Sequence, residues 1–369
     1  MIKELNPSTR ILMGPGPSNV HPRVLKAMST PLIGHLDPQF IQIMDEVKEM
    51  TRQLFQTNNQ ITSVISGTGS AGMETCFVNL LEPGDEVMVC VNGVFGNRMC
   101  ELVERSGAKL IRVDAPWGKP VDPAQVKEAI EKSSPKVVAI VHAETSTGVL
   151  QPLEEISRMV NDAGSLFLVD TVTSLAGTQV KADDWGIDAI YSGSQKCISA
   201  PPGLSPVSFS QKALKTMDSR KTRVQSWYLD MSMIRNYWAG AKRAYHHTGP
   251  ISMIYSIHEA LRIVFEEGLE KRFERHYRNH KILRDGLEAM GFEFLVAPEY
   301  RLPMLNAIRI PAGYDDALIR SRLLNEYNIE IGAGLGEFAG KVWRIGLMGE
   351  SCTLNHINML LGALKTIFG

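Results

Sequence analysis

The sequence predicts an α/β protein with a mostly parallel β-sheet, followed by a smaller α+β domain. Over residues 61–210, short runs rich in β-branched residues alternate with longer helical patterns, and repeated strand–helix units place helices on both sides of a sheet. Several of these runs are apolar throughout, which is typical of parallel strands that are buried on both faces. After about residue 250 the helices become longer and the strands fewer, which indicates a second domain.

The first domain is predicted from seven strand-like runs and the helices between them. The strands are expected at residues 61–66, 86–92, 109–113, 136–142, 165–170, 188–193 and 204–210. Helices are expected at about 71–81, 95–107 and 153–163, with another that begins at Asp122. Asp122 followed by Pro123 is a typical helix start, because Asp accepts from the first free N–H groups and Pro has no N–H to leave unpaired.

The second domain begins with a long amphipathic helix, predicted at about residues 269–290. A strand at 304–310, a helix at about 315–325, a strand at 341–347 and a last helix ending at Ile367 follow. A chain of 369 residues is long enough for two hydrophobic cores. We therefore expect an N-terminal arm over residues 1–20, a large domain over 21–265 and a small domain over 266–369.

The composition excludes several classes of protein. Lys and Arg number 39 and Asp and Glu 40, so no basic surface for nucleic acid is predicted. The five cysteines form no CxxC pair and no cluster at zinc spacing, which is typical of reduced thiols. No signal peptide is visible, and no apolar run approaches the roughly 20 residues of a membrane helix. We expect a cytoplasmic protein that binds small molecules, with no metal, nucleic-acid or membrane partner.

Asp170 and Lys196 carry the strongest chemical signal. Asp170 ends one apolar strand and Lys196 follows the next, and the carboxyl ends of parallel strands face one crevice. Pyridoxal 5′-phosphate (PLP) needs a lysine that forms an imine with its aldehyde and a carboxylate that keeps its ring nitrogen protonated. Either residue alone is more often an ordinary turn or surface residue. Together they predict PLP as the cofactor and these two residues as catalytic.

A glycine-rich segment, residues 66–72, joins a predicted strand to a predicted helix. Glycines let the backbone approach a phosphate, the helix N-terminus offers free N–H groups, and Thr68 and Ser70 add hydroxyl groups. The segment also fits the G-x-G-x-x-G dinucleotide pattern. However, the next strand ends in Asn92 rather than in the acidic residue that binds ribose. We predict a phosphate site and keep an NAD-dependent dehydrogenase as a distant alternative.

Phe95 and Arg344 are further candidates because of their positions. Phe95 follows a strand at its carboxyl end, where its ring can stack on a pyridine ring. Arg344 lies inside an apolar strand, where an arginine is costly unless it is paired or faces a polar cleft. Its planar guanidinium fits an α-carboxylate, and a structural ion pair is the alternative.

Two groups of histidines do not predict a metal site. The adjacent His246 and His247 do not suggest a metal site, because neighbouring side chains in extended backbone point to opposite faces. His276 and His280, with arginines between them, predict a solvent-exposed helix face.

Ordered segments along nearly the whole chain resemble the class V aminotransferases, and among these the alanine–glyoxylate (serine–pyruvate) aminotransferases. They include LMGPGPSN (12–19), VISGTGSAGME (64–74), HAETSTGVLQPL (142–153), LFLVDTVTSL (166–175), YSGSQK (191–196) and GLGEFAGKVWRIGLMG (334–349). The resemblance implies the PLP-transferase fold type I, with a seven-stranded, mostly parallel sheet. It also implies ping-pong transfer of an amino group from alanine or serine to glyoxylate, giving glycine and a 2-oxo acid.

The resemblance further implies roles for individual residues. Lys196 would carry PLP as a Schiff base, and Asp170 would pair with the ring nitrogen. The other expected cofactor contacts are Thr68, Gly69, Ser70 and Gln195 at the phosphate, Phe95 on the ring and Thr145 near the ring hydroxyl. Arg344 would bind the substrate carboxylate, and Gly14 and Gly16 would border the substrate pocket. Tyr245 and Thr248 would reach the phosphate of the partner subunit, in a homodimer with shared active sites.

Other substrates remain open. Ureidoglycine–glyoxylate and serine–glyoxylate aminotransferases are the nearer alternatives, whereas Gln195 before the lysine disfavours a cysteine desulfurase. If Arg344 is the only arginine in the crevice, aspartate and glutamate would bury a second charge without a partner and should be poor donors. Arg10, Arg98 and Arg243 could reach the pocket from loops or from the other subunit.

Overall fold

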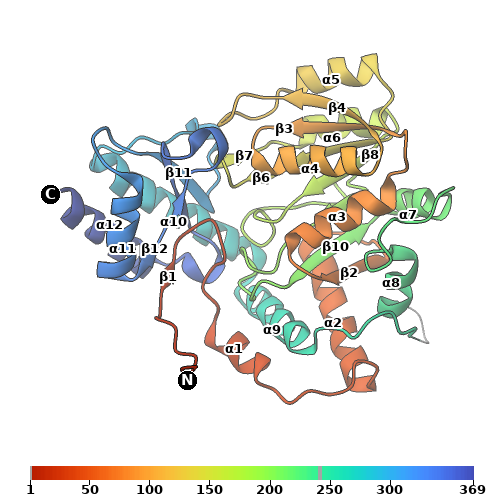
Figure 1. The fold of residues 1–369 in the computed structure, drawn as a ribbon, viewed down its shortest axis with the longest axis horizontal. Helices are drawn as coiled ribbons and strands as arrows, with labels where there is room; N and C mark the ends of the chain where they lie inside the picture. The colour runs from red at the N-terminus through yellow and green to blue at the C-terminus, as the bar shows by residue number, and fades with distance from the viewer. Residues whose placement is uncertain (1, 240–242) are drawn as a thin grey trace.

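The computed structural model describes residues 2–239 and 243–369, and its larger part is a seven-stranded sheet between two layers of helices (Figure 1). The order is β2–β10–β9–β8–β5–β3–β4, and β10 runs in the opposite direction to the other strands of this sheet. The strands are β2 (Ile61–Ser66), β3 (Glu86–Val91), β4 (Lys109–Asp114), β5 (Val137–Val141), β8 (Leu166–Asp170), β9 (Ala189–Tyr191) and β10 (Leu204–Phe209). The predicted fold class and mostly parallel sheet are confirmed.

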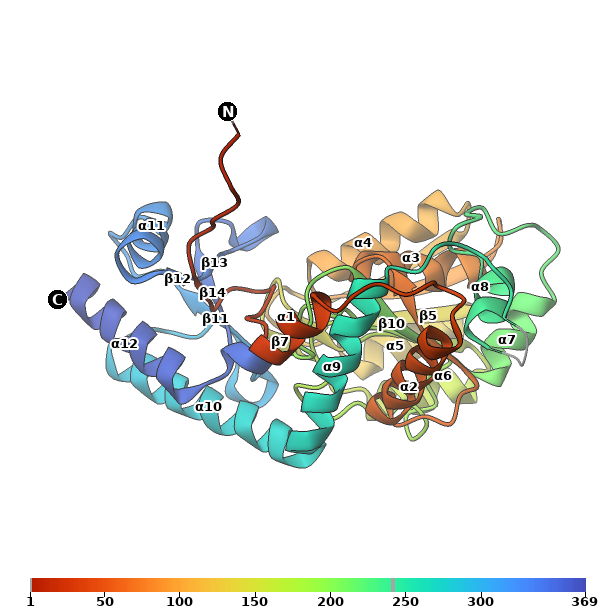
Figure 2. The ribbon, with the colours of Figure 1, turned by 90° about the horizontal axis from the view of Figure 1, so that it is seen from below.

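Helices cover both faces of this sheet. The helices of this part are α1 (Pro22–Met28), α2 (Pro38–Phe55), α3 (Gly69–Leu80), α4 (Val94–Arg105), α5 (Pro123–Lys132), α6 (Glu154–Asp162), α7 (Gln211–Asp218), α8 (Met231–Trp238) and α9 (Ile251–Glu267). Helices α3 and α4 lie on one face and α5 and α6 on the other (Figure 2), as right-handed crossovers require. Asp122 caps α5 through the N–H of Ala124, with Pro123 at its first position, as predicted. A short hairpin, β6 (Ala143–Glu144) and β7 (Val149–Leu150), follows β5.

The C-terminal part has its own hydrophobic cluster around a three-stranded antiparallel sheet, β11–β14–β13. Its elements are α10 (Leu269–Ala289), β11 (Leu305–Arg309), α11 (Asp316–Tyr327), β12 (Ile329–Glu330), β13 (Gly332–Ala333), β14 (Val342–Gly346) and α12 (Leu354–Phe368). The N-terminal strand β1 (Ile11–Leu12) pairs in parallel with β12, and Met13 is buried in this cluster. The arm therefore packs with the C-terminal part. The domain limits near residues 20 and 265 stay a prediction.

The expected exposed face of α10 is wrong. Arg272 is 1% exposed, His276 0% and His280 5%. The Arg272 guanidinium donates to the Glu267 carboxylate and to the carbonyl of Cys197 at 2.6 Å, and the N–H of Gly349 donates to His276 Nε2 at 3.0 Å. Helix spacing alone could not reveal the carbonyl of Cys197 or the N–H of Gly349 as partners, because they come from a loop of the large part and from the segment before α12.

No helix in the described ranges combines the length and apolarity needed to cross a membrane. Among the same residues, no three His, Cys, Asp or Glu side chains gather as a metal site would require. The expectation that His246 and His247 point to opposite faces is wrong: their Nδ1 atoms are 2.8 Å apart, and His247 Nε2 lies 2.7 Å from Ser66 Oγ.

Candidate active site

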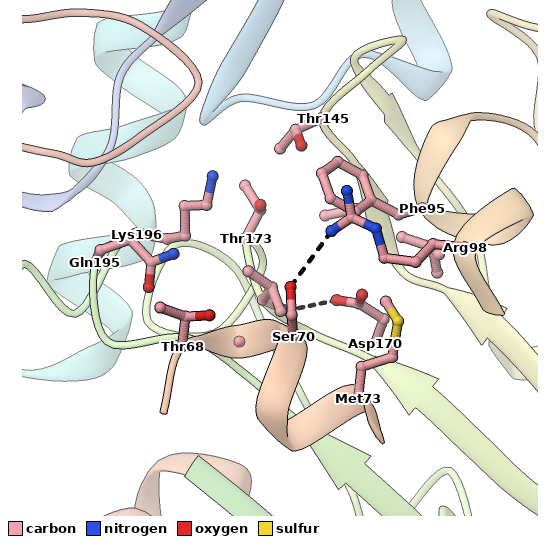
Figure 3. Close-up of a pocket in the computed structure, with 14 residues that line it drawn as sticks. Thr68, Ser70, Met73, Phe95, Arg98, Thr145, Asp170, Thr173, Gln195 and Lys196 are labelled. Carbon is pink, nitrogen blue, oxygen red and sulfur yellow. Dashed lines mark hydrogen bonds between the residues drawn. The ribbon is translucent and has the colours of Figure 1, made fainter. Parts of the chain in front are cut away.

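A cavity of about 210 Å³ lies at the carboxyl ends of β5 and β8, beside the N-terminus of α3. Lys196 and Gln195 face Phe95 and Arg98 across it, with Asp170 at its floor (Figure 3). Eight sequence-predicted residues line this cavity: Thr68, Gly69, Ser70, Phe95, Thr145, Asp170, Gln195 and Lys196. The structure thus brings to one cavity the residues predicted from strand ends, from the glycine-rich segment and from the family resemblance.

Asp170 is the last residue of β8 and is only 3% exposed. Its Oδ1 accepts from the N–H of Val172 at 2.8 Å, and its Oδ2 accepts from the hydroxyl of Tyr191 at 2.6 Å. Burial raises the pKa of Asp170 to about 6, and the two hydrogen bonds oppose that shift. The site therefore holds a carboxylate that is ionised near neutral pH and faces the cavity.

Lys196 lies in the turn between β9 and β10. Burial lowers the pKa of its amine to about 8, and the positive charge of Arg344 acts in the same direction. The amine donates to the carbonyl of Pro15, and Ser18 Oγ donates to the carbonyl of Lys196 at 2.9 Å. A Cβ on Gly16, whose φ is +107°, would lie 2.7 Å from Lys196 Nζ. The N-terminal arm thus holds the lysine and needs glycine there.

The N-terminus of α3 forms the end of the cavity that is suited to bind a phosphate. Thr68 is the N-cap residue but its side chain makes no capping hydrogen bond, so its hydroxyl group is available. Gln195 reaches the same end, and its side-chain oxygen is buried without a hydrogen-bond partner among the residues that the structure describes. Free N–H groups, hydroxyl groups and a carboxamide at a helix N-terminus are the groups that bind an anion.

Phe95 is held by a buried carboxylate that sequence reasoning missed. Glu144 Oε2 accepts from the N–H of Phe95 at 3.1 Å, and Oε1 accepts from Ser146 N–H at 3.0 Å and Ser146 Oγ at 2.6 Å. A Cβ on Gly93 would collide with Glu144. Burial raises the pKa of Glu144, yet the groups bonded to its carboxylate are all donors, which favours the ionised form. Glu144 caps α4, which carries the aromatic ring into the cavity.

Arg98 also lines the cavity. Its Nη1 lies 3.4 Å from Ser70 Oγ, and its guanidinium carbon lies 4.9 Å from the centre of the Phe95 ring. The other two arginines that the sequence left open bind elsewhere. Arg10 donates to Asn328 Oδ1, and Arg243 pairs with Asp45. Arg98 is therefore the arginine that lines the cavity, whereas the sequence had suggested Arg344, which is not among the lining residues.

Arg344 lies on β14 behind Thr145 and is 7% exposed. Its Nε donates to the carbonyl of Ala333 at 2.6 Å, and its Nη1 lies 3.3 Å from the carbonyl of Thr145. Burial lowers the pKa of its guanidinium to about 10. No carboxylate within the described ranges forms an ion pair with it, so the structural ion pair is not observed.

Like Arg344, four other predicted residues lie outside the cavity lining. Gly14 and Gly16 belong to the arm, next to β14 and Lys196 respectively. Tyr245 and Thr248 are exposed and do not contribute to the cavity of their own chain. Their predicted contact with a partner subunit stays a prediction.

The fold, with this sheet order and with a lysine and an aspartate lining one cavity at the strand ends, is that of the PLP-dependent aminotransferases. A family model described as aminotransferase class-V matches residues 11–342. The chain is 42% identical to an alanine–glyoxylate aminotransferase of Rattus norvegicus, over 98% of this chain and 88% of the relative. It is 38% identical to an (S)-ureidoglycine–glyoxylate transaminase of Bacillus subtilis (strain 168), over 99% and 92%.

A solved alanine–glyoxylate aminotransferase of Nostoc sp. superposes with a TM-score of 0.98 at 45% identity, covering 100% of this chain and 98% of that one. This chain belongs to the class-V aminotransferase family.

Proposed function

We propose that this protein is a PLP-dependent aminotransferase that moves an amino group from a small amino acid, alanine or serine, to glyoxylate. The observation that carries the proposal is the cavity in which Lys196, Asp170 and the α3 N-terminus meet. Relatives named for alanine–glyoxylate and ureidoglycine–glyoxylate transfer support glyoxylate as the acceptor. The nicotinamide alternative lacks support, because Asn92 replaces the ribose-binding acid.

The residues of the cavity fit PLP. Thr68, Gly69, Ser70 and Gln195 would hold its phosphate, with Gln195 donating from its amide nitrogen. The amide oxygen of Gln195 is buried without a partner among the described residues and would accept from a donor in the occupied site. Phe95 would cover the ring, Thr145 would lie near its hydroxyl group and Asp170 would face its nitrogen. When bound, PLP supplies an electron-withdrawing ring that stabilises negative charge at the substrate Cα.

The chain's own residues perform the rest of the chemistry. Asp170 holds a proton on the ring nitrogen, because a buried carboxylate stabilises the adjacent positive charge. Lys196 Nζ moves the substrate Cα proton, and a pKa of about 8 suits a base that must be neutral yet accept a proton. Arg344 orients the substrate through its α-carboxylate, and Phe95 helps to exclude water.

A competition assay tests the choice of substrate. Initial rates would be measured with equal alanine, serine, aspartate and ureidoglycine, each with glyoxylate. We expect alanine or serine to react fastest. A ten-fold preference for ureidoglycine, which corresponds to about 1.4 kcal/mol, would move the assignment to the ureidoglycine enzymes. A preference for aspartate would show that Arg98 binds a second carboxylate.

Arg344→Lys should raise KM for both amino and keto acids by about 10-fold or more, because a point charge replaces a two-pronged guanidinium. Steady-state kinetics with alanine and glyoxylate measure it. Arg322→Lys, at an exposed ion pair with Glu326, is the control and should leave KM unchanged. An unchanged KM in the Arg344 variant would show that Arg344 holds only backbone carbonyls.

The uptake of PLP by cofactor-free protein should depend on pH. Only the neutral amine of Lys196 attacks an aldehyde, and burial lowers its pKa to about 8. The uptake rate should therefore increase from about pH 7 to about pH 9 and then level off. Stopped-flow absorbance measures the rate, and borohydride reduction with peptide mass spectrometry identifies the lysine. A rate that is constant across this range would contradict the lowered pKa.

We also propose that the protein is a homodimer in which Tyr245 and Thr248 complete the partner's phosphate site. Both are exposed in one chain, and Tyr245 is one of six exposed large side chains in residues 25–36 and 227–245. These are Leu25, Leu32, Leu36, Trp227, Tyr228 and Tyr245. Such apolar exposure is typical of a surface that is covered in an assembly.

We also propose that the protein is located in the cytoplasm.

Mixing two inactive variants tests the shared site. After subunit exchange, a dimer of Lys196→Ala and Thr248→Ala has one site with both lesions and one with neither. Random exchange should restore activity to about a quarter of the wild-type value. Activity equal to the average of the two parents would rule the shared site out.

A further inference from the structure

Tyr191 is a fully buried residue that has no role in the chemistry proposed above. It ends β9 directly opposite Asp170, its register partner on the parallel strand β8. Its exposed fraction is 0%, and its hydroxyl donates to Asp170 Oδ2 at 2.6 Å. The other carboxylate oxygen accepts from the N–H of Val172 at 2.8 Å. Each oxygen of Asp170 thus has one protein donor.

The packing around Tyr191 holds the phenol in place. Helix α3 approaches so closely at Gly72 that a Cβ there would lie 3.2 Å from Tyr191 Cβ and would collide with Ser205. The N–H of Thr171 donates to the carbonyl of Tyr191 at 2.9 Å, which fixes the backbone of β9 against β8. Because backbone and ring are both fixed, the hydroxyl meets the carboxylate in one geometry.

The charge of Asp170 depends on a balance of its neighbours. Burial disfavours the ionised carboxylate, and so does the negative charge of Glu144 on β6. The Tyr191 hydroxyl, the Val172 N–H and the Lys196 amine favour it. Cys76 on α3 is also near, and it stays a neutral thiol because burial and Asp170 both raise its pKa. Of the favourable groups, Tyr191 donates a hydrogen bond from a side chain that lies outside the cavity lining.

We propose that Tyr191 is a positioning residue, whose hydroxyl keeps the Asp170 carboxylate ionised and turned so that it can face a protonated ring nitrogen. The role of Tyr191 in catalysis rests on the proposed PLP-dependent function. The effect of its hydroxyl on the ionisation of Asp170 does not depend on that function. A merely structural tyrosine would fill space and leave the proton affinity of Asp170 unchanged.

Tyr191→Phe tests the proposal, because it removes the hydroxyl and keeps the ring. The matched control is Tyr255→Phe, since Tyr255 is also buried and its hydroxyl lies 3.4 Å from the carbonyl of Pro31, outside the cavity. The first measurement uses cofactor-free protein with ¹³C-labelled aspartate carboxyls, in which the Asp170 signal is assigned by its loss in Asp170→Asn. We expect the titration midpoint of Asp170 to rise by about one to two pH units in Tyr191→Phe and to stay unchanged in the control.

The second measurement uses PLP-loaded protein. The acid limb of the kcat–pH profile should move to higher pH in Tyr191→Phe while KM changes little. If Tyr191→Phe does not fold, 3-fluorotyrosine introduced at position 191 replaces it. Its more acidic hydroxyl should lower the Asp170 midpoint.

An Asp170 midpoint that moves in neither variant would overturn the proposal. A shifted midpoint in a protein that neither binds PLP nor transaminates would uphold the contact and overturn the proposed function instead.

Discussion

Replacement of Lys196 by alanine is expected to abolish transamination, lowering kcat by a factor on the order of 10⁵ or more. The side chain provides both the covalent attachment and the base, and no other lysine lines the cavity in the described part of the chain. The variant should also lose the visible absorbance of the lysine-bound cofactor. The fold should persist, since the amine packs against the arm and contributes little to either hydrophobic core.

A control variant separates loss of chemistry from loss of fold. Lys212 donates to the carbonyl of Ser165 at 2.7 Å, outside the cavity, so Lys212→Ala should keep its activity. Thermal unfolding of both variants checks their stability. Near-normal turnover by Lys196→Ala would remove the central claim that Lys196 is the base.

Asp170→Asn has the second largest expected effect. The variant should bind PLP but turn over slowly, because a neutral amide cannot hold the ring nitrogen protonated. The expected loss is about 3–4 kcal/mol of transition-state stabilisation, as for other preorganised electrostatic groups. Steady-state kcat measures it. Asp188→Asn is the matched control, because Asp188 is also buried and accepts from a backbone N–H (Phe167) and a hydroxyl (Ser210) away from the cavity.

Asp170→Asn should not lower the stability of the fold at neutral pH. Burial raises the pKa of Asp170 to about 6, above its usual value of 3.8. An acid whose pKa is higher in the folded chain than in the unfolded chain lowers the stability once pH exceeds the unfolded value. Removing that charge should leave the unfolding temperature at pH 7 unchanged or higher. A lower kcat together with lower stability would instead indicate general damage to the site.

The part of this site that the sequence could predict lies at the ends of strands. Continuous apolar runs identified β5 and β8, and the geometry of a parallel sheet then brought Asp170 and Lys196 to one crevice. The glycine-rich segment was likewise placed at the N-terminus of α3. These predictions rely on local patterns and on one general property of sheets, so they needed no tertiary detail.

The contacts that the sequence could not supply are made between distant segments. Glu144 follows an apolar strand, but nothing local shows that it caps α4, whose first residues lie about fifty positions earlier in the chain. Tyr191 looks like any strand aromatic until the register of β9 with β8 is known. The burial of Arg272 depends on the turn that follows Lys196. Periodicity reports which face of an element is apolar, but it does not report which partner covers a charge.

The pairing of the two chain ends has a consequence for assembly of the enzyme. Met13 O accepts from the N–H of Gly346 at 2.7 Å, and Met13 N–H donates to Glu330 O at 2.9 Å. Ribosomes synthesise the first of these residues long before the last. The loop that holds Lys196 therefore cannot dock until nearly the whole chain has been translated, although the large sheet can form earlier. A chain that terminates before β14 would keep Lys196 and Asp170 but would lack Arg344 and the strand to which the N-terminal arm binds.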